Sequence, residues 1–99
     1  MFVVTGATGT IGRAAVQLLH SEGRRVAAVT RRSYAAGFPS SVRVVGGDPS
    51  APASLADGLA ELGGVEAVLV SPRAAGEATG ELLALAARHG AKRVVVSRL

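Results

Sequence analysis

The chain has 99 residues, of which 48% are hydrophobic, with no cysteine and a formal net charge of +4. This length allows one domain at most, the hydrophobic share excludes a disordered chain, and the lack of cysteine excludes a disulfide framework. Basic residues are scattered and only 3% of residues are aromatic, so we expect no nucleic-acid platform. No signal peptide and no apolar run of roughly 20 residues is visible, so we expect one cytoplasmic domain over residues 1–99, without a membrane partner.

Short apolar runs alternate with helical patterns along the first half of the chain. The run from Phe2 to Thr5 is β-branched and ends in glycine, which is typical of a buried strand. Apolar residues at helical spacing follow it from Ile11 to Leu19, and Gly23 is the expected end of that helix. Further strands are expected over 26–30 and 42–45.

The second half continues the same alternation. Pro52 suits a first helical turn, and Ser54 with Asp57 three residues later resembles a capping box, so we expect a short helix there. A strand over 65–70, a helix over about 74–88 and a strand over 94–97 complete the pattern. The alternation predicts an α/β fold, a parallel sheet covered on both faces.

Three glycines lie between the first strand and the first helix. Gly6 can take the tight turn, Gly9 lets the backbone approach a pyrophosphate, and Gly12 lets the helix pack closely. The free N–H groups and the dipole of the helix attract phosphates. The pattern predicts a dinucleotide-binding turn formed by Gly6, Ala7, Thr8, Gly9, Thr10, Ile11 and Gly12, whereas the alternative is a turn that serves packing only.

The spacing of these glycines also carries a family resemblance. Thr5-Gly6-Ala7-Thr8-Gly9-Thr10-Ile11-Gly12 resembles the glycine motif of the short-chain dehydrogenase/reductase superfamily, most closely its atypical branch of NmrA-like, NAD(P)H-binding proteins. Val29-Thr30-Arg31-Arg32 and Val45-Gly46-Gly47-Asp48 resemble the ends of that branch's second and third strands, and 90–97 resembles its fifth. The resemblance implies a doubly wound, Rossmann-like sheet of five strands in the order 3-2-1-4-5, with the C-terminal part of the family fold absent.

Two further positions follow from the resemblance alone. It implies that Asp48 lies by the adenine and that Ser71 lies near the ribose or nicotinamide. The residues themselves leave an alternative for the first position, because Asp48-Pro49 also suits a turn.

Two arginines indicate which dinucleotide is bound. Arg31 and Arg32 follow the second strand, where an acid would bind the ribose 2′-hydroxyl of NAD, or an arginine the 2′-phosphate of NADP. No acid is present at this point, and a guanidinium matches a phosphate in geometry and charge. We therefore expect NADP(H) to be preferred, with NAD(H) possible. The alternative is a solvated basic loop.

No catalytic or metal-binding residue is predicted. The Tyr-x-x-x-Lys pair common in reductases of the superfamily cannot be made from Tyr34 and Lys92, the single tyrosine and lysine. His20 and His89 are far apart in the sequence and lack acidic or thiol neighbours, so they do not form a metal site. The expected function is the NADP(H)-binding part of an oxidoreductase whose catalytic and substrate segments lie elsewhere. The alternatives are a non-catalytic redox-sensing regulatory module and a non-functional remnant.

The fifth strand has an expected consequence for association. In the order 3-2-1-4-5 it lies at an edge, and no helix is available to cover one of its faces. Val94, Val95 and Val96 are then exposed, so we expect the isolated chain to self-associate or to be marginally soluble.

Overall fold

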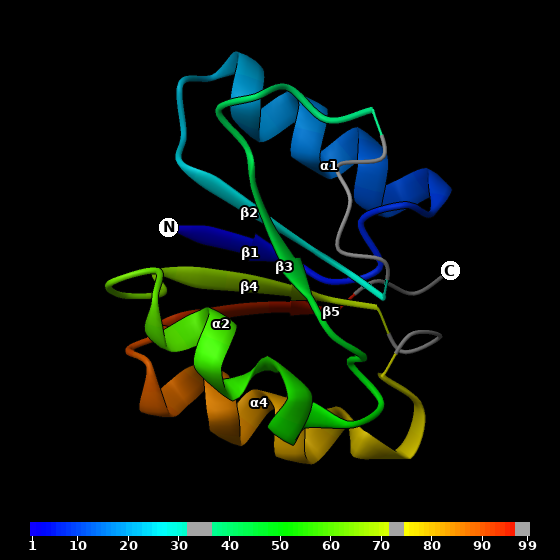
Figure 1. The fold of residues 1–99 in the computed structure, drawn as a ribbon, viewed down its shortest axis with the longest axis vertical. Helices are drawn as coiled ribbons and strands as arrows, with labels where there is room; N and C mark the ends of the chain where they lie inside the picture. The colour runs from blue at the N-terminus through cyan, green and yellow to red at the C-terminus, as the bar shows by residue number, and fades with distance from the viewer. Residues whose placement is uncertain (32–36, 72–74, 97–99) are drawn as a thin grey trace.

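A five-stranded parallel sheet with helices on both faces forms the computed structural model, which describes residues 1–31, 37–71 and 75–96 (Figure 1). The strands are β1 (Phe2–Val4), β2 (Val26–Thr30), β3 (Arg43–Gly46), β4 (Ala67–Val70) and β5 (Arg93–Val96). Their order is β3-β2-β1-β4-β5, and every pair of neighbours is parallel. The predicted Rossmann-like sheet and its strand order are therefore confirmed.

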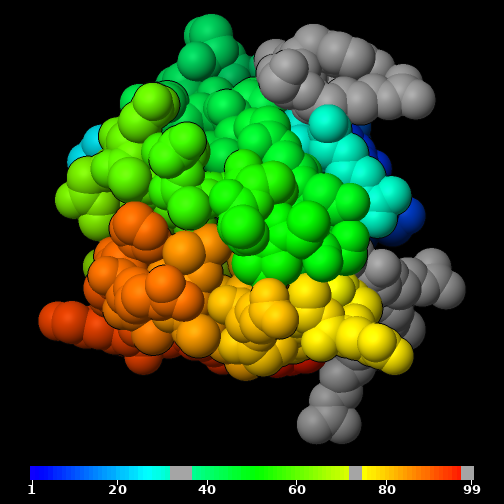
Figure 2. All heavy atoms as spheres, turned by 60° about the horizontal axis from the view of Figure 1, so that its bottom comes forward, coloured from blue at the N-terminus to red at the C-terminus, as the bar shows by residue number. Residues whose placement is uncertain are grey.

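Helices cover the two faces of the sheet unequally. Helix α1 (Thr10–Ser21) lies on one face, whereas α2 (Ala56–Ala60) and α4 (Thr79–Arg88) lie on the other (Figure 1). Two single 3₁₀ turns, η1 (Pro52–Leu55) and η2 (Gly76–Ala78), lead into α2 and α4. Figure 2 shows the segments around α2 and α4 packed side by side over their face of the sheet, and η1 contacts α4.

The apolar runs predicted from the sequence supply two separate cores. Successive side chains of a strand point to opposite faces, so Val3 joins the cluster under α2 and α4 while Val4 joins the cluster under α1. All five residues of β2 are buried, as a strand covered on both faces requires. The sheet is thus held from both sides around β1 and β2, the strands that lead toward the glycine turn and Arg31.

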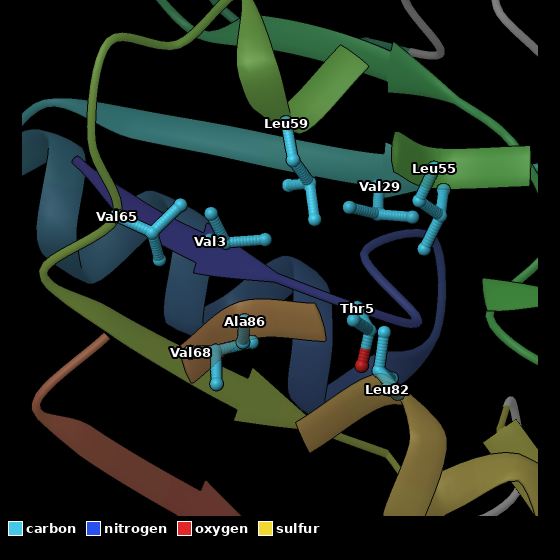
Figure 3. A pocket seen from close by; sticks show the side chains of 9 residues that line it. All are labelled: Val3, Thr5, Val29, Leu55, Leu59, Val65, Val68, Leu82 and Ala86. Carbon is cyan, nitrogen blue, oxygen red and sulfur yellow. The ribbon is translucent and has the colours of Figure 1, made fainter. Parts of the chain in front are cut away.

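A small void remains in the larger core (Figure 3). Its volume is about 10 Å³, close to the space of one water molecule. Eight of the nine lining residues are apolar, and the hydroxyl of the ninth, Thr5, already donates to the Leu69 carbonyl. The void is therefore a packing gap without room for a cofactor; its lining consists of Val3, Thr5, Val29, Leu55, Leu59, Val65, Val68, Leu82 and Ala86.

The expected capping box at Ser54 and Asp57 is wrong. The chain starts to coil at Pro52, so Ser54 lies inside η1 and its hydroxyl donates to the Ala51 carbonyl at 2.7 Å. No side chain caps α2. The Ser54 hydroxyl also accepts the N–H of Asp48 at 3.0 Å, so it braces the loop after β3 instead of the helix.

Other predicted boundaries shift by a few residues. The fifth strand spans 93–96, so its expected last residue, Ser97, lies outside the described residues. The helix expected from Ala74 becomes η2 followed by α4, and Ala74 is also outside the described ranges. Among the residues that the structure describes, no helix is long and apolar enough to cross a membrane.

Burial predicts how two leucines on different helices contribute to stability. Leu82 on α4 is 2% exposed, whereas Leu18 on α1 is 60% exposed. Leu82→Ala should lower the free energy of unfolding by about 2–5 kcal/mol, because it leaves a cavity in the core. Leu18→Ala should change it by less than about 0.5 kcal/mol. Urea unfolding of both variants checks this, and equal losses would contradict the assignment of Leu82 to the core.

Candidate dinucleotide-binding site

The glycine turn folds back on itself directly after β1. Gly6 has a φ of 62°, in the left-handed region that residues with a Cβ rarely adopt. The N–H of Gly9 then donates to the Gly6 carbonyl at 3.0 Å. A Cβ at Gly12 would overlap the Gly6 carbonyl group and lie 2.9 Å from the Cα of Ala7. Gly12 therefore lets α1 begin in contact with the turn itself.

This close approach leaves the start of α1 open. Gly9 is the N-cap residue, and no side-chain hydrogen bond from the described residues caps the helix. The first intrahelical bond runs from the N–H of Arg13 to the Gly9 carbonyl at 2.9 Å, so the N–H groups of Thr10, Ile11 and Gly12 precede it. These groups and the positive end of the helix dipole make an anion-binding terminus.

The individual residues of the turn divide into exposed and structural ones. Thr8, Gly9, Thr10 and Ile11 are exposed. Ala7 is buried, and its N–H donates to the Val29 carbonyl at 3.4 Å, so this group is used within the fold. The predicted motif is thus continuous in space, but not all of its members face outward.

Thr5, expected as the last residue of the first strand and the first of the glycine motif, connects the turn to β4. Its side chain is 1% exposed, and its hydroxyl donates to the Leu69 carbonyl at 2.9 Å. The same oxygen accepts the N–H of Ser71 at 2.9 Å. Ser71 is therefore fixed beside the start of the glycine turn. A buried threonine at a strand end, where a hydroxyl needs a partner, was the available signal.

Arg31 and Asp48 meet at the ends of β2 and β3. The Arg31 Nε lies 3.5 Å from the Asp48 Oδ1, with side-chain exposures of 66% and 40%. Hydrogen bonds from the Ser50 hydroxyl and N–H, together with the Arg31 charge, lower the pKa of the Asp48 carboxyl. Asp48 thus adopts an Asx turn, in line with the turn alternative. Arg32 lies outside the described residues.

A shallow, open hollow of about 350 Å³ runs from the glycine turn along α1. Thr8, Gly9, Thr10 and Arg13 line it, with Ala14 and Gln17 further along the helix. The Arg13 guanidinium lies over the Phe38 ring, 5.0 Å from its centroid. Of the predicted site residues in the described ranges, the hollow contains three, while Arg31, Asp48 and Ser71 lie at the neighbouring strand ends.

Parallel strands place all these residues at one edge of the sheet. The turn follows β1, Arg31 follows β2, Asp48 follows β3 and Ser71 follows β4, and the carboxyl ends of these strands point the same way (Figure 1). Ligands of open α/β sheets bind outside this edge, where the strand order reverses. Within the described ranges, no group of three or more histidine or acidic residues is suited to hold a metal ion.

A family model described as NAD(P)H-binding matches residues 6–99. The chain belongs to this NAD(P)H-binding family. No curated protein sequence matches the chain significantly.

Solved structures similar to this NAD(P)H-binding chain include a member of the short-chain dehydrogenase/reductase superfamily. A short-chain dehydrogenase/reductase superfamily protein from Agrobacterium tumefaciens, solved with NAD, is 29% identical, with a TM-score of 0.75 over 97% of this chain and 31% of its own. MoeE5 in complex with UDP-glucose and NAD is 29% identical, with a TM-score of 0.66 over 96% of this chain and 35% of its own.

A third solved structure is similar to this chain in its fold alone. The UDP-glucose 4-epimerase of Thermus thermophilus, in complex with NAD, is 17% identical, with a TM-score of 0.76 over 94% of this chain and 35% of its own. The chain therefore spans about a third of the length of these three proteins.

Two Gly→Ala substitutions, one in the glycine turn and one on α4, should have opposite effects on stability. Gly12→Ala should destabilise the fold by about 1–3 kcal/mol, because the new Cβ collides with backbone atoms that cannot rotate away. Gly80→Ala on α4 meets no atom within 4 Å and should stabilise it by about 0.4–1 kcal/mol. Thermal unfolding of both variants measures the difference; a Gly12→Ala protein as stable as the parent would refute the close approach.

Proposed function

We propose that this chain is the cofactor-binding part of an NmrA-like or atypical short-chain oxidoreductase and that it prefers NADP(H) to NAD(H). The observation that carries the proposal is the uncapped start of α1, which follows the glycine turn at the carboxyl edge of the sheet. The family model supports dinucleotide binding in general. The preference for NADP(H) rests on the arginines that follow β2.

In this proposal the turn binds the pyrophosphate. The N–H groups of Thr10, Ile11 and Gly12 donate to it, and the hydroxyls of Thr8 and Thr10 add donors. A Cβ at Gly9 would lie 3.3 Å from the Gly6 carbonyl and would also crowd the space above the turn. Gly6 and Ala7 contribute through backbone conformation, since the N–H of Ala7 is used by Val29.

The two ends of the dinucleotide then lie on either side of the turn. Arg31 and Arg32 bind the 2′-phosphate of the adenosine half, and Asp48 lies by the adenine. Ser71, fixed by Thr5, lies on the ribose or nicotinamide side. The exposed guanidinium of Arg31 supports its assignment, because a charged hydrogen bond to phosphate needs a donor that the ligand can reach.

Hydride transfer is the chemistry that a nicotinamide cofactor supplies when bound. The residues of this chain bind and orient the cofactor in the proposal. The acid and the substrate pocket come from elsewhere, because Tyr34 and Lys92 are separated by 58 positions and cannot supply the Tyr-x-x-x-Lys pair.

Titration with NADP⁺ and NAD⁺ tests the proposed preference. NADP⁺ should bind more tightly than NAD⁺ to the unaltered chain. Arg31→Ala should weaken NADP⁺ binding about tenfold, because it removes one charge-assisted hydrogen bond, and should leave NAD⁺ binding nearly constant. Arg43→Ala is the matched control, because Arg43 is exposed at the opposite end of β3. Tighter or equal binding of NAD⁺ by the unaltered chain would refute the preference.

We also propose that β5 is a surface for association with a second copy of the chain. Val94, Val95 and Val96 are all exposed, and Val95 is 58% exposed. Successive residues of a strand face opposite sides, so the described part of the chain leaves both faces of β5 uncovered. An apolar strand at a sheet edge offers both unpaired backbone groups and hydrophobic surface to a second strand.

Sedimentation velocity over a range of concentrations tests the association. The unaltered chain should form dimers or larger species as concentration rises, and Val95→Lys should shift it toward monomer because a charge is placed on the edge strand. Leu18→Lys provides the control, since Leu18 is equally exposed but lies on α1. A monomer at every concentration would refute this proposal.

A further inference from the structure

We propose that Asp48 is a specificity-determining residue that opposes the 2′-phosphate of NADP and favours the 2′-hydroxyl of NAD. This inference rests on the proposed dinucleotide function. The sequence has no acid directly after β2, which is why Arg31 and Arg32 alone predict NADP. The fold supplies that acid from β3 instead.

The register of β2 and β3 brings the two residues together. Thr30, the last residue of β2, pairs with Gly46, the last residue of β3. The N–H of Gly47 continues the contact by donating to the Thr30 carbonyl at 3.0 Å. Arg31 and Asp48 follow directly on the two chain segments, and their side chains meet with 3.5 Å between Nε and Oδ1.

The Asp48 carboxylate is held where it is, independently of Arg31. The hydroxyl and the N–H of Ser50 both donate to Oδ1, at 2.7 Å and 2.9 Å. The Asp48 backbone is braced as well, since its N–H donates to the Ser54 hydroxyl. The negative charge therefore stays in place after β3, whether or not the Arg31 side chain moves toward a ligand.

A fixed carboxylate acts in opposite directions on the two cofactors. A 2′-phosphate that approaches Arg31 must also approach Asp48, and like charges at short range repel. A 2′-hydroxyl carries no charge and can donate a hydrogen bond to a carboxylate, as in NAD-binding domains. Arg31 and Asp48 thus favour different cofactors, and their balance limits the preference for NADP.

The affinities of the unaltered chain and of one variant for NADP⁺ and NAD⁺ test the balance between Arg31 and Asp48. NADP⁺ and NAD⁺ are titrated by calorimetry at one ionic strength into the unaltered chain and into Asp48→Asn. Removing the charge should tighten NADP⁺ binding by about threefold to tenfold and leave NAD⁺ binding equal or weaker, because only the phosphate is repelled. The ratio of the two affinities is the readout.

Two further variants serve as a control and as a second test. Asp57→Asn removes the same charge from an exposed position on α2 and should leave the ratio unchanged, which separates a local effect from the net charge. Asp48→Ser keeps a short acceptor for the turn without the charge and should shift the ratio as Asp48→Asn does. It serves as the test if Asp48→Asn does not fold.

The outcomes separate this inference from the proposed function. If the unaltered chain binds dinucleotide and the ratio is the same in Asp48→Asn, the inference is overturned and the proposed function stands. Weaker NADP⁺ binding in Asp48→Asn would also overturn it, since Asp48 would then be orienting Arg31 toward the phosphate. If the unaltered chain binds neither cofactor, both proposals fail.

Discussion

The close approach between Gly6 and Gly12 is the constraint on which the rest of this edge depends. Because neither residue has a Cβ, the chain can leave β1 with a left-handed turn and start α1 against the same backbone atoms. The helix then begins at the sheet edge, with no side-chain cap from the described residues on its first N–H groups. A Cβ at position 12 would collide with the turn, and a residue with a Cβ at position 6 would rarely adopt the left-handed conformation, so either change would disturb the helix terminus beside the ends of the neighbouring strands.

The fold was predictable because its signals are local. Buried strands show as short β-branched runs, and alternation with helical patterns favours a parallel sheet whose order follows from the family resemblance. The glycine turn was predictable for the same reason, since Gly6, Gly9 and Gly12 lie within seven residues. The hydrogen bonds within the turn were not predictable in this way. Ala7 is part of the motif, yet its N–H donates to the carbonyl of Val29, more than twenty positions away.

The features that the sequence did not reveal depend on which hydrogen-bond partners the fold brings together. Thr5 shows in the sequence as a hydroxyl at a strand end that needs a partner, but only the fold identifies Leu69 and Ser71 as its partners. Ser54 with Asp57 matches the spacing of a capping box, but the Ser54 hydroxyl has closer partners in Ala51 and in the N–H of Asp48. A pattern of residue types shows which hydrogen bonds are available, whereas tertiary structure decides which one forms.

Affinity and selectivity have different physical sources at this edge. In our proposal, the terminus of α1 attracts the pyrophosphate through neutral N–H groups and a dipole, so it favours both dinucleotides alike. Among the described residues that follow the carboxyl ends of β2 and β3, Arg31 and Asp48 carry the charges that, in our proposal, distinguish a 2′-phosphate from a hydroxyl. The net charge of +4 does not settle that choice, because the counts of basic residues include side chains such as Arg24, which lies over Phe2 near the start of β1. In our proposal, the choice depends on how much of the Arg31 charge remains effective beside a carboxylate that Ser50 holds in place.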